Sequence, residues 1–171
     1  MSQEFYDLNP VGHITADAIG PPGERVFYLQ GSHEDTMVTV VLEKEQVQAL
    51  AISVDQMLEE LEKRRPQSAA EVELISEYDL VLREPIDPVF RVGQLGLGYD
   101  EDSDMLIVVA QELTDEGEEM SVVRFWATRA QMKALSEHSL RVVEAGRPTC
   151  PLCGQPIDKD GHYCPRRNGH K

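Results

Sequence analysis

The sequence predicts an α+β fold: two related β-meander-plus-helix units that form a sheet with helices on one face, plus a C-terminal zinc ribbon. Three observations predict it. Strand-like segments precede a helical pattern twice along the 171 residues. The two helical segments match when one is shifted by 85 positions. All three cysteines lie between positions 150 and 164, beside a histidine.

The first unit, residues 1–66, is expected to contain three strands and one helix. Apolar and β-branched residues concentrate at 11–19, 25–30 and 36–42, as is typical of strands. Apolar residues then recur every three or four positions, which indicates a helix with one buried face. That stripe consists of Val47, Leu50, Val54, Met57 or Leu58, and Leu61.

Residues 67–88 are expected to link the units. Ser68 and Glu71 have the spacing of a capping box, which predicts a short helix at about 69–77. Pro85 and Pro88 then interrupt the chain before the next strands. The linker would therefore end in extended chain.

The second unit, residues 89–146, repeats the order of the first. Strand patterns at 90–98, 105–113 and 120–127 precede a helix that opens with a capping box of Thr128 and Gln131. Gly146 is a suitable residue for the C-terminal end of this helix. The match between the helices rests on these pairs: Gln46 and Gln131, Ala49 and Ala134, Leu50 and Leu135. Two such units would join into one sheet, or into two packed sheets, with helices on one face.

The segment 147–171 predicts a metal site. Cys150 and Cys153, followed by Gly154, have the spacing of a zinc knuckle, and Cys164 is a third ligand. The fourth is His162 or His170. His162 is preferred because it lies two residues from Cys164, so both side chains face the same way on extended chain.

A complete set of four protein ligands closes the coordination sphere, which makes the predicted zinc structural. Iron at such a site prefers four cysteines, so zinc is favoured over iron. Three reduced thiols without a metal are the plain alternative. The ligated segment would act as a staple for the C-terminal end or as a surface for a partner.

The charge is uneven along the chain. Residues 147–171 hold five basic and two acidic side chains and so carry a charge of +3. Since the net charge of the whole chain is −15, the other residues together carry −18. An acidic body repels phosphate backbones, so extensive nucleic-acid binding is disfavoured. No run of 18 apolar residues and no signal-peptide pattern is present, so we expect a cytoplasmic protein without a membrane span.

Other candidate sites are weak. His13 and Asp17 could share one strand face, but no serine or cysteine stands in a nucleophile context. The acidic run at 100–104 lacks the glycine and glutamate of a calcium loop, so we interpret it as a solvated hairpin tip. Phe125 and Trp126 end a strand, where aromatic residues favour the core.

The chain resembles an uncharacterised, largely actinobacterial family, a domain of unknown function, over nearly its full length. The resemblance rests on "FYLQ", "LEKEQVQAL" and the tail "CPLCGQPIDKDGHYCPRRNGH". Family tails of the form CP-x-CG-x-P-x-D and GH-x-CPR-x-NG imply Cys150, Cys153, His162 and Cys164 as ligands. An aromatic residue is usual in the family where this chain has His170. The resemblance also implies a phosphatase-like and a kinase-like protein as genomic neighbours.

The most direct expectation is therefore a zinc-binding protein that engages a protein partner without catalysis. Pairing with a second copy at an exposed sheet edge stays open. The alternative is an enzyme, or enzyme subunit, that acts on a phosphorylated small molecule. A deep polar pocket between the units, lined by His13 or Arg91, would favour this alternative. A weak nucleic-acid contact through the basic tail is the third.

Overall fold

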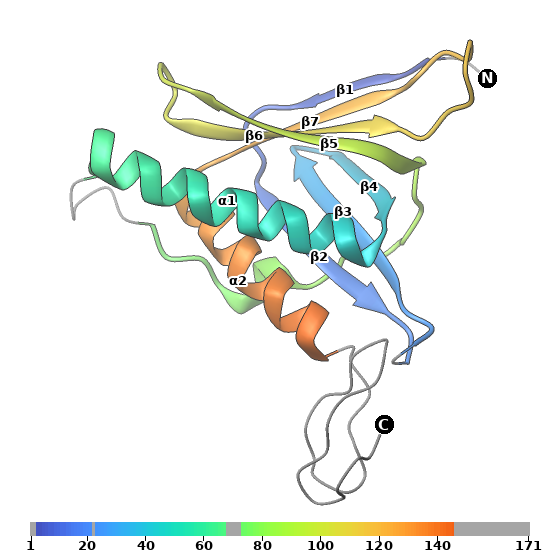
Figure 1. Cartoon of the computed structure of the whole chain (residues 1–171), viewed down its shortest axis with the longest axis horizontal. Coiled ribbons are helices and arrows are strands. Elements are labelled where there is room, and N and C mark those ends of the chain that lie inside the picture. The colour runs from blue at the N-terminus through green and yellow to red at the C-terminus, as the bar shows by residue number, and fades with distance from the viewer. Residues whose placement is uncertain (1–2, 22, 68–72, 146–171) are drawn as a thin grey trace, which may run out of the picture.

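The structure is a computed structural model that describes residues 3–21, 23–67 and 73–145. It confirms the α+β class, and one mixed seven-stranded sheet packs against two helices (Figure 1). Each expected run of three strands and a helix is present, and one strand precedes them. The elements are β1 (Phe5–Leu8), β2 (His13–Ile19), β3 (Val26–His33), β4 (Thr36–Leu42), α1 (Lys44–Arg64), η2 (Glu77–Leu80), β5 (Phe90–Asp100), β6 (Met105–Glu112), β7 (Val122–Ala127) and α2 (Arg129–Ala145).

The strands are ordered β1-β7-β6-β5-β4-β3-β2. Strands β2 to β4 form one antiparallel meander and β5 to β7 form another, as expected. A short parallel pairing joins them, in which Val40 and Val41 of β4 lie opposite Phe90 and Arg91 of β5. The additional strand β1 runs parallel to β7. The option of one continuous sheet is thus the observed one.

The two ends of the sheet are connected through the chain that passes from β1 to β2. The Val11 N–H donates to the Trp126 carbonyl (2.8 Å), and the Gly12 N–H donates to the Ser32 carbonyl (2.7 Å). The same few residues therefore hydrogen-bond to both β7 and β3. The sheet must curve strongly for these contacts to form, which brings β3 against β7.

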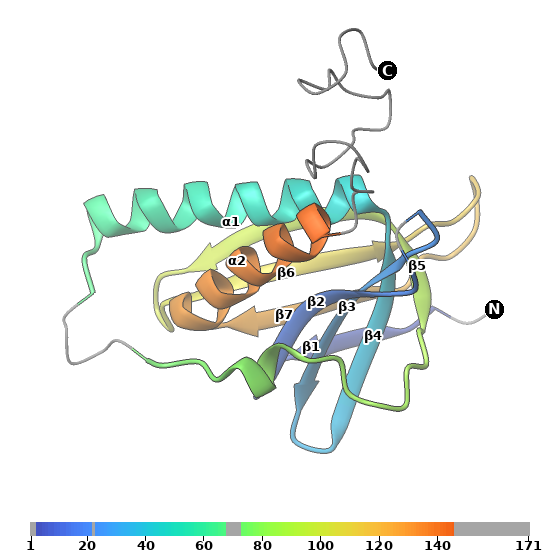
Figure 2. The ribbon, with the colours of Figure 1, turned by 90° about the horizontal axis from the view of Figure 1, so that it is seen from below.

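Both helices cover the same side of the β5–β7 part of the sheet (Figure 2). The predicted stripe of α1 is confirmed, because Val47, Leu50, Val54 and Leu61 are buried, while Met57 and Leu58 are partly buried. The core continues through alternate residues of the strands, including Leu29, Val40, Leu106, Val108 and Phe125. No helix in the described part of the chain is long and apolar enough to cross a membrane.

The first turn of α2 confirms the predicted capping box. The Gln131 N–H donates to Thr128 Oγ1 (3.1 Å), and the Gln131 side-chain oxygen accepts from the Thr128 N–H (2.9 Å). The amide nitrogen of Gln131 also donates to the Val11 carbonyl (3.0 Å). One side chain thus caps α2 and fastens it to the start of β2.

Gln46 does the same for α1. Its side-chain oxygen accepts from the Glu43 N–H (2.7 Å), and its amide nitrogen donates to the Val92 carbonyl in β5 (3.1 Å). Gln46 therefore anchors α1 to β5, the first strand of the second meander, and Gln131 anchors α2 to the chain just before β2, the first strand of the first meander. This reciprocal arrangement supports the proposed duplication. The unit boundaries at 66, 88 and 146 stay a prediction.

The linker differs from its prediction. Residues 68–72, which include the expected capping box, lie outside the described residues, and 73–76 are not helical. The helix expected up to residue 77 is therefore wrong over that part, and a 3-10 turn, η2, forms instead at Glu77–Leu80. Its Asp79 N–H donates to the Ser76 carbonyl (3.0 Å), so the turn closes locally.

Linker residues 80–83 cover the outer face of β2 and β3 through buried polar contacts. The Thr15 hydroxyl donates to the Leu80 carbonyl (2.7 Å). The Gln30 side chain donates to the Arg83 carbonyl (2.9 Å) and accepts from the Arg83 N–H (2.8 Å). Thr15 and Gln30 are fully buried, so these hydrogen bonds offset the cost of removing them from water.

The approach of β3 to β7 requires a glycine. A Cβ at Gly31 would lie 2.6 Å from a ring carbon of Phe125, and Phe125 is fully buried. We expect Gly31→Ala to lower the free energy of unfolding by about 1–3 kcal/mol, because the core cannot accept the extra methyl without moving. Urea unfolding measures this. Gly98→Ala on β5 is the control, since a Cβ there meets nothing within 4 Å. Equal stabilities for the two variants would contradict the prediction.

Candidate functional site

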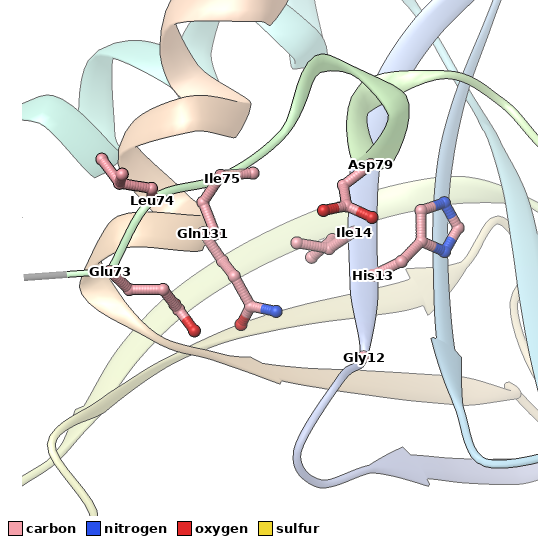
Figure 3. A pocket seen from close by; sticks show the side chains of 8 residues that line it. All are labelled: Gly12, His13, Ile14, Glu73, Leu74, Ile75, Asp79 and Gln131. Carbon is pink, nitrogen blue, oxygen red and sulfur yellow. The ribbon is translucent and has the colours of Figure 1, made fainter.

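A pocket of ≈ 120 Å³ lies where β2, the linker and the first turn of α2 meet (Figure 3). The residues that line it are Gly12, His13, Ile14, Glu73, Leu74, Ile75, Asp79 and Gln131. Glu73 and Leu74 are exposed and form its rim, whereas His13, Ile14 and Gln131 are buried. The pocket therefore has a solvent-facing acidic side and a buried polar base.

His13 is the most buried ionisable group of the pocket, with 1% of its surface exposed. Its Nδ1 lies 3.2 Å from Ser32 Oγ on the neighbouring strand, and its Nε2 has no hydrogen-bond partner among the described residues. The pKa of His13 is lowered to about 4, mainly by burial and in addition by the positive charge of Arg83, against a raising effect of Asp79. The imidazole is thus neutral at pH 7.

Among the described residues, each of the two carboxylates of the pocket has one side-chain partner. Glu73 accepts a hydrogen bond from the Thr128 hydroxyl (2.7 Å), and Asp79 lies 3.5 Å from an Arg83 guanidinium nitrogen. Figure 3 shows the Asp79 side chain descending from η2 toward the level of the imidazole, with Glu73 and Gln131 on the opposite side. Carboxylates accept several hydrogen bonds each, so both keep acceptor capacity.

The residues singled out on β2 lie on one face of the strand but do not act together. The backbone alternation places His13, Thr15 and Asp17 on the same side. Thr15 is bound to the linker, and Asp17 lies 3.0 Å from His138 of α2. This row is therefore used to attach the linker and α2 to β2.

Arg91, the other side chain expected to mark a pocket between the units, lies outside it. Its guanidinium lies 2.6 Å from the Glu43 carboxylate ahead of α1, and both side chains are more than half exposed. Of the two side chains expected to line a pocket between the units, His13 does so and Arg91 does not.

The predicted zinc ligands Cys150, Cys153, His162 and Cys164, and the alternative His170, lie outside the described residues. Within residues 3–21, 23–67 and 73–145, no group of three or more histidine, cysteine or acidic side chains is placed to hold a metal. The ligand set therefore stays a prediction from the sequence.

The acidic run at 100–104 is only partly the solvated tip that the sequence predicts. Asp104 accepts hydrogen bonds from the Tyr99 hydroxyl (2.5 Å) and from buried Arg129 (2.9 Å to Nη2). Burial alone would raise the pKa of Asp104, but these two donors outweigh it and lower the pKa. Asp104 thus attaches the β5–β6 hairpin to the start of α2, and the solvated interpretation is wrong for this residue.

A second surface feature lies on the outer face of β1 and β7, away from the helices. Phe5 is 60% exposed, and the Arg124 guanidinium lies between aromatic rings, 4.9 Å from the Phe5 centroid and 5.8 Å from that of Trp126. Asp7 accepts from the Trp126 indole N–H (2.6 Å) and lies 3.2 Å from Arg124. We call these four residues the aromatic–arginine face.

The expectation that both Phe125 and Trp126 join the core holds only for Phe125. Neighbouring residues on a strand face opposite sides, so burying Phe125 puts Trp126 on the outer face. Ile107 and Val109 of β6 lie opposite Trp126 and Arg124 and are only partly buried. Strand alternation could have indicated this surface, but β1, which carries Phe5 and Asp7, was missed.

The buried imidazole predicts a pH dependence. The unfolded chain binds a proton on His13 near pH 6.5, whereas the folded protein resists protonation down to about pH 4. The stability that the protein gains from keeping His13 neutral is thus complete above pH 6.5, falls as the pH drops from 6.5 to 4, and is lost below pH 4. We expect His13→Gln to show a flatter pH dependence over this window, measured by urea unfolding.

The matched control is His33→Gln, on the β3–β4 hairpin outside the pocket, which leaves the buried imidazole in place and should retain the pH dependence that His13 contributes. The imidazole NMR signals of His13 give the pKa directly. A midpoint near 6.5 for His13 would show that the imidazole is hydrated and would contradict the prediction.

Comparisons with known proteins show the family but no function. Neither the curated proteins nor the solved structures gave a match. One family model matches residues 6–164, which includes every strand and helix after the first residue of β1. This agrees with the expectation of an uncharacterised family. Since the match covers most of the sequence, the chain belongs to the family described as "Protein of unknown function (DUF3090)".

Proposed function

We propose that the chain is a zinc-binding protein whose folded body is a non-enzymatic module for a protein partner. The chemistry of the C-terminal donor set supports zinc binding. The aromatic–arginine face supports the binding of a protein partner. The two halves are tested separately, because they lie in different parts of the chain.

The donor set supports a structural zinc ion. Cys150, Cys153 and Cys164 supply soft thiolates and His162 an imidazole, a combination that suits zinc with four protein ligands. Such a site leaves no position open for a substrate. A short segment that cannot bury a core of its own can be held by metal ligation, so the ion would order the basic end of the chain.

The aromatic–arginine face supports protein binding. Phe5, Arg124 and Trp126 belong to the residue types that are enriched at protein interfaces and at their energetic centres. Arg124 stacks on the two rings and pairs with Asp7, so the side chains are held in place before a partner arrives. An ordered surface loses less conformational entropy on binding. Partly buried Ile107 and Val109 extend the apolar area beside it.

The enzyme alternative receives weaker support. The His13 pocket lies at the junction that the alternative requires. Its ionised side chains, however, are the carboxylates of Glu73 and Asp79, which repel a phosphate group. A phosphorylated substrate is therefore disfavoured at this pocket. A nucleic-acid contact is disfavoured for the same reason over the whole acidic body.

Metal content tests the first half. We expect native mass spectrometry to find one zinc ion per wild-type chain. Cys164→Ser and His162→Ala should weaken zinc binding by about 10-fold or more in a chelator competition, because each removes a ligand. His170→Ala is the matched control and should keep the wild-type affinity. If His170→Ala loses zinc and His162→Ala retains it, the fourth ligand is His170 instead of His162. A wild-type protein without metal would refute the zinc site.

Site-specific photo-crosslinking in the native cells tests the second half. A photoreactive phenylalanine analogue at position 5 should capture one defined protein, and the same analogue at Tyr78, which is 87% exposed on the linker, should not. Arg124→Glu should abolish the capture at position 5 by reversing the charge at the centre of the face. If the captured protein is a second copy of this chain, the face is a homodimer interface. Equal capture at both positions would refute the proposal.

A further inference from the structure

We infer that the His13 pocket binds a cationic group, an alkylguanidinium or alkylammonium, through the carboxylates of Glu73 and Asp79. The inference is independent of the zinc site and of the aromatic–arginine face, since it involves neither set of residues. It rests on three observations: the charge of the rim, the buried acceptor at the base, and the size of the pocket.

The rim supplies the charge. Glu73 and Asp79 come from opposite ends of one short linker segment and both line the pocket. Their partners in the described part of the chain, the Thr128 hydroxyl and the Arg83 guanidinium, leave acceptor positions unused. Arg83 lies at 3.5 Å and is about half exposed, so it screens Asp79 only in part. A second cation can therefore bind between the two carboxylates.

The base supplies a buried acceptor. His13 is 1% exposed, and its Nε2 has no partner in the described part of the chain. When Nδ1 carries the proton and donates it to Ser32, Nε2 presents a lone pair. Burial keeps the pKa of His13 near 4, so the neutral imidazole does not repel a cation at pH 7. Nε2 itself has almost no contact with solvent, so a donor in the pocket reaches it only when the imidazole shifts; that contact would satisfy an atom that is costly to leave unpaired.

The size limits the ligand. A volume of ≈ 120 Å³ suits a small group such as guanidinium or methylammonium better than a nucleotide. The Gln131 amide is committed to Thr128 and Val11, so the wall of the pocket is rigid on that side. The ligand is therefore a free small cation or the end of an arginine or lysine side chain.

Titration with methylguanidinium chloride at pH 7 and constant ionic strength tests this, followed by the NMR signals of the His13 imidazole and the Gln131 side-chain amide. We expect saturable shifts with a dissociation constant of millimolar order, because the contact is small and open to water. Neutral N-methylurea, which has a similar shape, and inorganic phosphate should give no saturable shift at the same concentrations.

Variants distinguish the pocket from general attraction to an acidic protein. Asp79→Asn and Glu73→Gln should each weaken binding by about 5- to 10-fold, since each removes one charge-assisted contact. Glu77→Gln is the matched control, because it removes an equal charge from η2 outside the pocket and should leave binding unchanged. Arg83→Gln should strengthen binding by releasing Asp79. These shifts in affinity would support the site.

A titration with an arginine-containing peptide identifies the source of the cation. If Gly-Arg-Gly binds at least about tenfold more tightly than methylguanidinium, the pocket receives a side chain of a partner protein; equal affinity indicates a free small cation. Three results would overturn the inference: no saturable shift with methylguanidinium, equal weakening by Glu77→Gln and Asp79→Asn, or saturable binding of phosphate.

Discussion

The side-chain amide of Gln131 is the interaction on which the other parts of the structure depend. Its oxygen caps α2 at Thr128, and its nitrogen holds the Val11 carbonyl at the start of β2. Val11 in turn donates to Trp126, so the same point fixes β7. Gln131 is buried, and losing it would leave two backbone groups unpaired away from water. It also forms one wall of the pocket, so the fold and the candidate site share this anchor.

Gln46 shows that this anchor belongs to a repeated scheme. Each glutamine attaches its own helix to the other meander: Gln46 binds Val92 in β5, and Gln131 binds Val11 just before β2. The two halves are therefore interlocked, because each helix has an anchor in the other half. Such an arrangement couples the stability of the halves, since opening one end releases the hydrogen bonds of the other.

Two regions of the outer face of the sheet differ in what covers them. The linker covers the outer face of β2 and β3, where Thr15 and Gln30 meet its backbone, and the pocket with His13 lies at the edge of this cover. The outer face of β1 and β7 is left open, with Phe5 exposed. A neutral, buried imidazole beside two carboxylates favours a cation, whereas stacked aromatic rings around an arginine favour a protein surface. We therefore propose two separate binding sites.

The sequence by itself determined the α+β class, the two runs of three strands followed by a helix, the buried stripe of α1 and the cap at Thr128, because these follow from local periodicity and capping chemistry. It also supplied the zinc donor set, which stays a prediction. Only the tertiary structure decided that β1 pairs with β7, that Trp126 faces outward, and that Glu73 and Asp79 meet His13 in a pocket. Those contacts join residues far apart in the chain, and pairing across such distances depends on the curvature of the whole sheet, which no local pattern encodes.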